Sequence, residues 1–133
     1  MSSIIRLLPG VILVALLFGC SKSQSEPPPP SSTQSFEELG EVYKYIEYSK
    51  LRPPTRDNDF VDYLDSLPSA FERIKNGEIK IAWGVGLSKA PGAANQVLAY
   101  EGKAATEGGA VLLRDGTVKQ LTAAEFQAAP KAK

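Results

Sequence analysis

The acidic residues Glu101, Glu107 and Asp115 have the side chains best suited to acid–base chemistry. Two carboxylates held in one pocket can serve a hydrolase as general acid and as base or nucleophile. Glu101 and Glu107 flank a glycine-containing segment that does not fix their separation, and Asp115 precedes Gly116, a pair that tight turns favour independently. Structural roles therefore explain these carboxylates better, and we expect no catalytic residue.

A second acidic group, Asp57, Asp59 and Asp62, has spacing reminiscent of a calcium-binding loop. An EF-hand loop beginning at Asp57 needs glycine at position 62 and glutamate at position 68, where this chain has Asp62 and Pro68. Helix capping and a solvated helix face explain the three carboxylates better, so we expect no metal site.

Glycine motifs and nucleophiles give no further site. Gly84 and Gly86 form a GxG pair, but Lys89 occupies the third glycine position of a dinucleotide fingerprint and no helical pattern follows. The chain has no histidine and one cysteine, which removes the usual general base and excludes an internal disulfide. With 15 basic and 15 acidic residues, nothing indicates nucleic-acid binding. We expect neither cofactor nor nucleic acid.

Two aromatic residues in expected strands, Trp83 and Tyr100, are the best candidates for an exposed contact surface. Aromatic side chains are enriched among the residues that contribute most to binding. Core packing nevertheless explains both residues better than a contact surface does.

The first 19 residues have the composition of a signal peptide. Arg6 precedes an apolar run that ends at Phe18, and the small residue Gly19 precedes Cys20. The run of 12 residues would rise roughly 18 Å as a helix, too short to span a bilayer unaided. We therefore expect cleavage between Gly19 and Cys20.

The sequence Leu17-Phe18-Gly19-Cys20 resembles the lipobox of bacterial lipoproteins. The resemblance implies that Cys20 carries diacylglycerol and further acyl chains such as palmitate, which anchor a protein stably in a bilayer. Ser21, in place of aspartate, favours the outer over the inner membrane by the sorting rule of enteric bacteria. A buried free thiol at Cys20 and an uncleaved membrane helix are the alternatives.

The remaining chain divides into a tether, one domain and a short tail. Residues 20–34 contain the lipidated cysteine and then a polar segment with the run Pro27-Pro28-Pro29-Pro30, which we expect to stay disordered. Residues 35–130 should form a single α+β domain, and residues 131–133 should be disordered.

Hydrophobic periodicity gives the elements of that domain. Ser35 and Glu38 have capping-box spacing and begin an amphipathic helix that Pro53 stops. A second helical segment, with Ser66 as a possible internal cap, covers residues 59–76 as one helix or as two divided at Pro68. We expect both to pack on a three- or four-stranded antiparallel sheet, followed by a short helix capped at Thr122. The strand patterns cover residues 79–83, 96–101, 110–114 and 117–121.

Residues 35–130 also resemble the type II secretion pseudopilins and related secreted proteins. The resemblance rests on the helix ending near Arg52-Pro53-Pro54, on residues 97–101, and on residues 108–119 with their Asp-Gly turn. It implies a helix packed on a small antiparallel sheet, as in short lipoproteins of unassigned function, and binding as the mode of action.

These observations predict a membrane-anchored envelope lipoprotein that acts as a non-enzymatic scaffold or partner-binding module outside the cytoplasm. Its expected contacts are the lipid bilayer, through acylated Cys20, and an envelope protein. Two alternatives stay open. One is an envelope hydrolase that uses the carboxylates, and the other is a pseudopilin-like component of a secretion apparatus.

Overall fold

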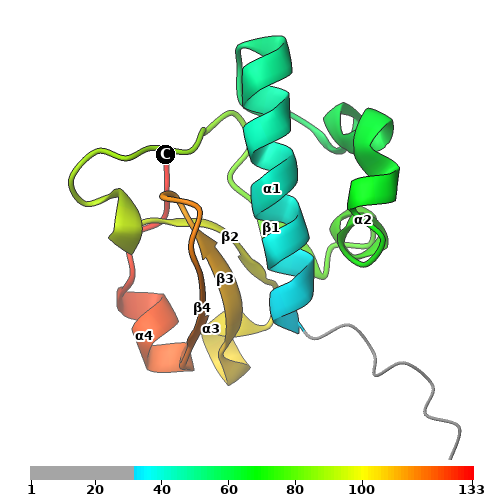
Figure 1. The fold of residues 1–133 in the computed structure, drawn as a ribbon. Coiled ribbons are helices and arrows are strands. Elements are labelled where there is room, and N and C mark those ends of the chain that lie inside the picture. Colours follow the sequence, from blue (N-terminus) through cyan, green and yellow to red (C-terminus); the bar gives the residue numbers. More distant parts are fainter. Residues whose placement is uncertain (1–31) are drawn as a thin grey trace, which may run out of the picture.

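The computed structural model describes residues 32–133 (Figure 1). The expected signal peptide, Cys20 and most of the tether lie outside the described residues. The domain combines helices with a four-stranded antiparallel sheet, so the expected α+β class is confirmed.

The sheet is a meander in which each strand pairs with the next along the chain. Its order is β1 (Ile79–Ile81), β2 (Val97–Glu101), β3 (Gly109–Leu113) and β4 (Val118–Leu121). The β2–β3 register is interrupted between Val97 and Ala99. This irregularity lets Leu98 and Ala99, although adjacent, both pack on the same side of the sheet.

The Asp115–Gly116 pair forms the β3–β4 turn, as the sequence predicts. The Leu113 amide donates to the Thr117 carbonyl, and the Gly116 amide donates to the Leu113 carbonyl. Gly116 has a φ of 92°, which a residue with a β-carbon rarely adopts. The loop thus contains three residues and ends in the glycine.

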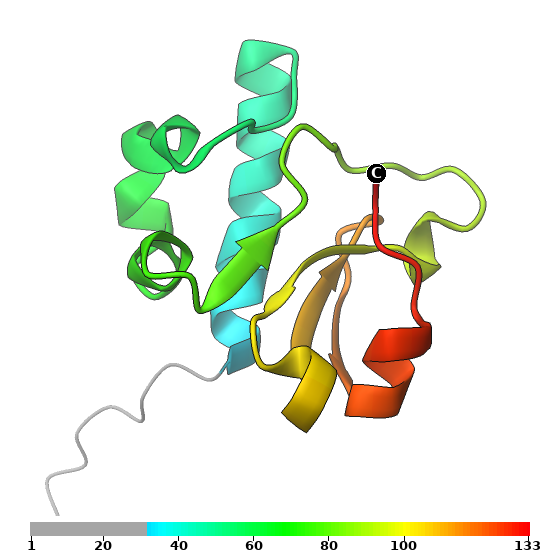
Figure 2. The same ribbon diagram turned by 180° about the vertical axis from the view of Figure 1, so that it is seen from behind.

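Helices on one side of the sheet enclose the larger core (Figures 1 and 2). They are α1 (Ser32–Lys50), the 3-10 helix η1 (Asp57–Ser66) and α2 (Ala70–Lys75). The second helical segment is therefore divided at Pro68. Buried side chains from all three helices meet the sheet in one cluster, whose larger members are Phe36, Leu39, Val42, Tyr43, Ile46, Phe60, Leu67, Ile74, Leu98 and Leu112.

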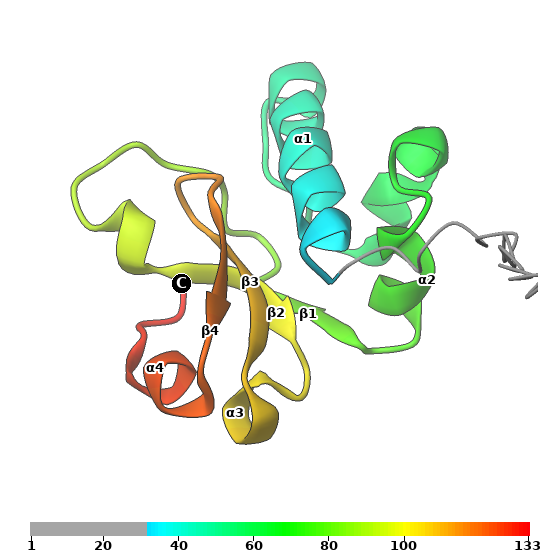
Figure 3. The same ribbon diagram turned by 60° about the horizontal axis from the view of Figure 1, so that its bottom comes forward.

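A smaller core lies on the other side of the sheet, beneath α3 (Ala104–Glu107) and α4 (Ala123–Ala128) (Figure 3). Thr122 caps α4 with a complete capping box, as expected, because its side chain and that of Glu125 exchange hydrogen bonds with each other's backbone amides. This cap directs Phe126 back onto the sheet, where the side chain is buried.

Two expected helix caps are not formed. α1 already includes Ser35, whose buried side chain contacts the Ser69 and Arg73 side chains, so it does not cap the helix. Ser66 is the last residue of η1 and does not cap α2, which Ser69 precedes. Ser35 therefore joins α1 to α2 through its side chain, where local spacing suggests a cap.

The end of the chain does not fray as expected. The Val97 amide donates to the Pro130 carbonyl and the Ala132 amide to the Val97 carbonyl, at 2.9 and 2.8 Å. Lys131 consequently forms a parallel bridge with Val97, and Ala132 is buried in the larger core. Residues 131–133, predicted to be disordered, thus include ordered backbone pairing.

Candidate functional site

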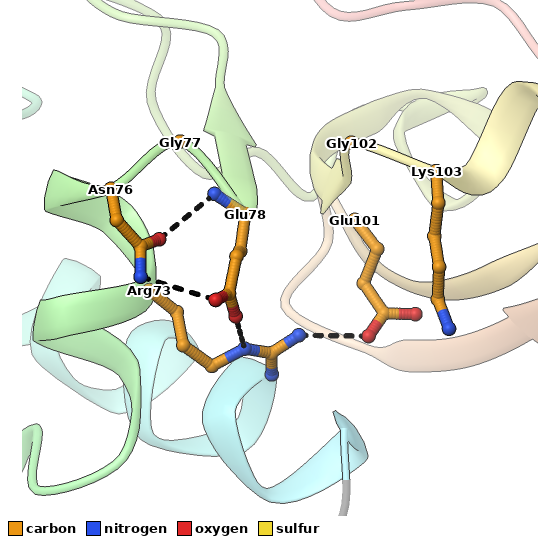
Figure 4. Close-up of a pocket in the computed structure, with 7 residues that line it drawn as sticks. All are labelled: Arg73, Asn76, Gly77, Glu78, Glu101, Gly102 and Lys103. Atoms are coloured by element: carbon orange, nitrogen blue, oxygen red, sulfur yellow. Dashed lines mark hydrogen bonds and ion pairs between the residues drawn. The ribbon is translucent and has the colours of Figure 1, made fainter.

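A polar pocket of about 440 Å³ lies between the turn that follows α2 and the turn that follows β2 (Figure 4). Its walls carry charges of both signs. The lining residues are Arg73, Asn76, Gly77, Glu78, Glu101, Gly102 and Lys103.

Arg73 joins three parts of the molecule at this pocket. Its Nη2 donates to Glu101 Oε1 of β2 at 2.8 Å, and its Nε donates to Glu78 Oε2 at 3.1 Å. Its Nη1 donates to Ser35 Oγ of α1 at 3.0 Å. The guanidinium therefore connects α2 to both the first helix and the sheet.

Glu101 is the buried partner in this junction, with a side chain only 6% exposed. Its second oxygen, Oε2, accepts a hydrogen bond from the Ala110 amide of β3 at 2.9 Å. A β-carbon at position 109 would overlap this carboxylate, so Gly109 makes room for it. Both oxygens of Glu101 are thus engaged by the protein.

The pocket has the character of a structural junction. Glu78 is also engaged through both oxygens, because Oε1 accepts from Asn76 Nδ2 at 3.1 Å and Oε2 accepts from Arg73. Arg73 lies between Glu78 and Glu101, bonded to both (Figure 4). The arrangement fixes the two carboxylates in place and assigns every one of their oxygens a partner.

The structure brings together two of the three carboxylates that the sequence singles out. Glu101 and Glu107 line a neighbouring pocket of about 420 Å³, where the exposed Glu107 pairs with Lys103 at 3.8 Å. Asp115 lies apart, in the β3–β4 turn, and accepts hydrogen bonds from the Thr117 hydroxyl and amide. These bonds hold the pKa of Asp115 below its ordinary value, the opposite of what a general acid at neutral pH requires.

The aspartates near residue 59 have structural roles. Asp59 is buried and accepts two hydrogen bonds from Arg52, at 2.9 and 3.0 Å, and one each from the Thr55 amide and hydroxyl. Asp62 is exposed and lies 4.0 Å from Lys50, and Asp57 begins η1. Within residues 32–133, no group of three or more acidic, histidine or cysteine side chains is placed to hold a metal ion.

Trp83 and Tyr100 do not form one surface. Trp83 is 39% exposed and packs on Phe60 of η1, with ring centroids 5.8 Å apart. Tyr100 belongs to the smaller core on the other side of the sheet, where its ring lies 4.9 Å from that of Phe126. Tyr100 therefore has a packing role, whereas Trp83 combines packing with partial exposure.

The outward face of α1 carries aromatic residues that the sequence reasoning missed. Tyr45 is 57% exposed and Tyr48 is 86% exposed, whereas the apolar stripe of the same helix is fully buried. Two tyrosines three residues apart and outside the apolar stripe are the signal that could have found them. Solvent contact of this extent marks Tyr45 and Tyr48 as a candidate contact surface.

Leu51, directly after α1, adds an unusual feature to this end of the helix. It is 88% exposed and has a φ of 55°, the only positive φ of a residue other than glycine within residues 32–133. A β-carbon disfavours this left-handed conformation, which helix ends usually give to glycine. An apolar side chain is thus held in solvent at a conformational cost.

Comparison of the chain with protein-family models, with curated proteins and with solved structures finds no match. Within residues 32–133, the helices are too short or too polar to cross a membrane.

Proposed function

We propose that this chain is a lipid-anchored lipoprotein of the bacterial cell envelope whose domain is a non-enzymatic scaffold or partner-binding module. The observation that carries the binding role is the exposure of Tyr45, Tyr48 and Leu51 at one end of α1. Aromatic side chains bring a large contact area with few rotatable bonds, which is why they dominate binding surfaces.

The position of these residues suits a tethered binding module. The tether joins α1 at Ser32, and 13 residues of helix place Tyr45 roughly 20 Å further along the axis. Figure 1 shows α1, which begins at Ser32, running without interruption to its far end. The exposed residues thus lie at the end of α1 that is directed away from the attachment point.

A binding role also agrees with the state of the carboxylates. Glu78, Glu101 and Asp59 are held by arginine and by other donors of the chain, and the pKa of Asp115 is lowered. The proposal further takes α1 as the amphipathic helix that the sequence predicts, with its apolar stripe on the sheet and its aromatic face outward.

The proposed location follows from the leader. Acylated Cys20 inserts into the bilayer, Ser21 favours the outer membrane, and the domain lies outside the cytoplasm. The resemblance to pseudopilin-like secreted proteins contributes the general arrangement of a helix on a small sheet, and assembly into a fibre is no part of the proposal.

Mass spectrometry of the mature protein from membranes tests the anchor. We expect a chain that begins at acylated Cys20. The Cys20→Ala variant should not be processed to an acylated mature form. A chain that begins at Met1, or an unmodified Cys20, would overturn the proposed anchoring.

Site-specific photo-cross-linking in intact cells tests the contact surface. A photoreactive phenylalanine analogue replaces Tyr48 in one variant and the exposed Ala105 of α3 in the control. We expect discrete cross-linked species from position 48 that are absent from position 105. The same pattern at both positions, or none at position 48, would contradict a binding role for this face.

A further inference from the structure

The exposed face of α1 has a defined charge pattern in addition to its tyrosines. Six exposed residues fall within a face about 100° wide at 100° per residue, opposite the buried apolar stripe. They are Gln34, Glu37, Glu41, Lys44, Tyr45 and Tyr48. Acidic residues thus occupy the amino-terminal half of the face, and a lysine and the tyrosines the carboxyl-terminal half.

This pattern is complementary to itself in one orientation only. Two parallel copies of α1 would oppose Glu41 to Glu41 and Lys44 to Lys44. Two antiparallel copies, related by a twofold axis between positions 42 and 43, oppose Glu41 of each copy to Lys44 of the other. The same register places Tyr48 against Glu37 of the other copy, where its hydroxyl can donate to the carboxylate.

The charges that this arrangement needs are accessible. Lys44 Nζ lies 2.7 Å from Glu41 Oε1 within one helix, and both side chains remain more than half exposed. An exposed pair of this kind contributes little by itself, so its members can join a four-charge cluster at the twofold axis without loss of a strong bond. The interaction between the opposed dipoles of two antiparallel helices also favours this orientation.

The proposed tether permits the antiparallel orientation on one membrane. The two Ser32 residues would lie at opposite ends of a helix pair roughly 28 Å long, since α1 has 19 residues. The 12 residues from Cys20 to position 31 reach about 37 Å when extended as polyproline II. Both anchors can therefore enter the same bilayer while the helix pair lies along its surface.

We propose that the outward face of α1 binds a second copy of this chain in antiparallel orientation. The inference rests on the proposed function, in which the domain is anchored to a membrane. The anchor is needed because one helix face is small compared with the roughly 1,600 Å² of a standard interface. Confinement to a membrane raises the effective concentration and makes such a weak pair effective.

Energy transfer between labelled copies in phosphatidylcholine vesicles tests this pairing. In the full mature lipoprotein, the substitution Lys89→Cys provides a thiol to which either the donor or the acceptor dye is attached. Lys89 is exposed and distant in sequence from α1. We expect transfer well above that of the same dyes on an unrelated lipid-anchored protein at equal density. Tyr48→Ala should lower the paired fraction about fivefold or more, as for an interface hot spot, and the exposed Val61→Ala of η1 serves as the matched control.

Charge reversal makes the test specific for the antiparallel register. Glu41→Lys alone and Lys44→Glu alone should each abolish pairing, because every opposed charge is then of like sign. A mixture of the two variants should restore it, because one copy presents two lysines and the other two glutamates. Equal energy transfer in the mixture and in either variant alone would overturn the proposed pairing. Energy transfer in Tyr48→Ala at the level of the wild type would also overturn it.

Failure of this pairing is distinguishable from failure of the proposed function. Monomeric behaviour in vesicles together with cross-links from position 48 to a different envelope protein in cells would overturn self-association and leave the binding role in place. An unacylated Cys20 would overturn the anchor, and the pairing would then be measured by sedimentation of the free chain at high concentration.

Discussion

Two arginine–carboxylate junctions of this domain use the same chemistry over different distances. Arg52 and Asp59 are seven positions apart and close the turn between α1 and η1, whereas Arg73 and Glu101 are 28 positions apart and join α2 to the sheet. The acidic side chain is 6% exposed in both. The first junction therefore shapes a local segment, and the second fixes the arrangement of separate elements.

The largest effect is expected from removal of the long-range junction. Glu101→Ala leaves the Ala110 amide and the Arg73 Nη2 without their partner and creates a small cavity between two layers. We expect a loss of about 3 kcal/mol in the free energy of unfolding, measured by urea denaturation. The control Glu107→Ala removes an exposed carboxylate and should change the value by less than about 0.5 kcal/mol.

Loss of the local junction should cost less. Asp59→Asn keeps the shape of the side chain but removes the charge that Arg52 and Thr55 stabilise, and we expect a loss of about 2 kcal/mol. An equal or larger loss than for Glu101→Ala would mean that the two junctions do not differ as the comparison proposes.

The local junction also predicts an acid sensitivity. Hydrogen bonds from Arg52 and Thr55 hold the pKa of Asp59 well below its ordinary value of 3.8. A depressed pKa in the folded state contributes stability that is fully present above the unfolded-state pKa and is lost as the pH falls below about 4. The free energy of unfolding should therefore fall more steeply between pH 6 and pH 2 in the wild type than in Asp59→Asn. The same pH dependence in both proteins would refute this assignment.

A gain in stability is expected immediately beside the local junction. Leu51 adopts its left-handed φ directly before Arg52, so Leu51→Gly should relieve backbone strain and raise the melting temperature by the equivalent of about 1 kcal/mol. Leu64 of η1 does not have a positive φ, so the control Leu64→Gly should destabilise the protein. A lower melting temperature for Leu51→Gly would show that the leucine side chain itself stabilises the turn.

The smallest effect on the free energy of unfolding is expected at Tyr43, whose buried hydroxyl takes part in neither junction. The Tyr43 hydroxyl is buried and has no hydrogen-bond partner among residues 32–133, and burial together with the charge of Glu47 raises its pKa. Tyr43→Phe should therefore change the free energy of unfolding by no more than about 0.5 kcal/mol, with stabilisation the expected sign. A loss above about 1 kcal/mol would indicate a partner for this hydroxyl, such as a bound water.

Local signals predicted three features of the carboxyl-terminal half correctly, whereas the helix α3 and the ordered end of the chain were not predicted. The alternation near residue 80, the Asp115–Gly116 turn and the Thr122 capping box each depend on a few adjacent residues. The same capping-box spacing fails at Ser35, because α1 begins earlier and Glu38 instead accepts hydrogen bonds from the Ser69 and Ala70 amides of a distant helix start.

The candidate site depended on contacts that no local pattern contains. Arg73 and Glu101 meet only because α2 packs beside the sheet, and the pairing of residues 130–132 with Val97 uses backbone atoms that any residue type supplies. The outward tyrosines were visible as residues outside the apolar stripe, but their exposure follows from where η1 and α2 pack against α1.

Arg73 also has a mechanical consequence for the proposed tethered form of the domain. A pulling force applied at Ser32 would reach Ser35 after less than one helical turn, and there the Arg73 guanidinium shares the load with Ser69. From Arg73 the force passes to Glu101 and so into the central strands of the sheet. In the proposed anchored form, the polar junction would therefore carry force from the amino-terminal helix into the central strands of the sheet.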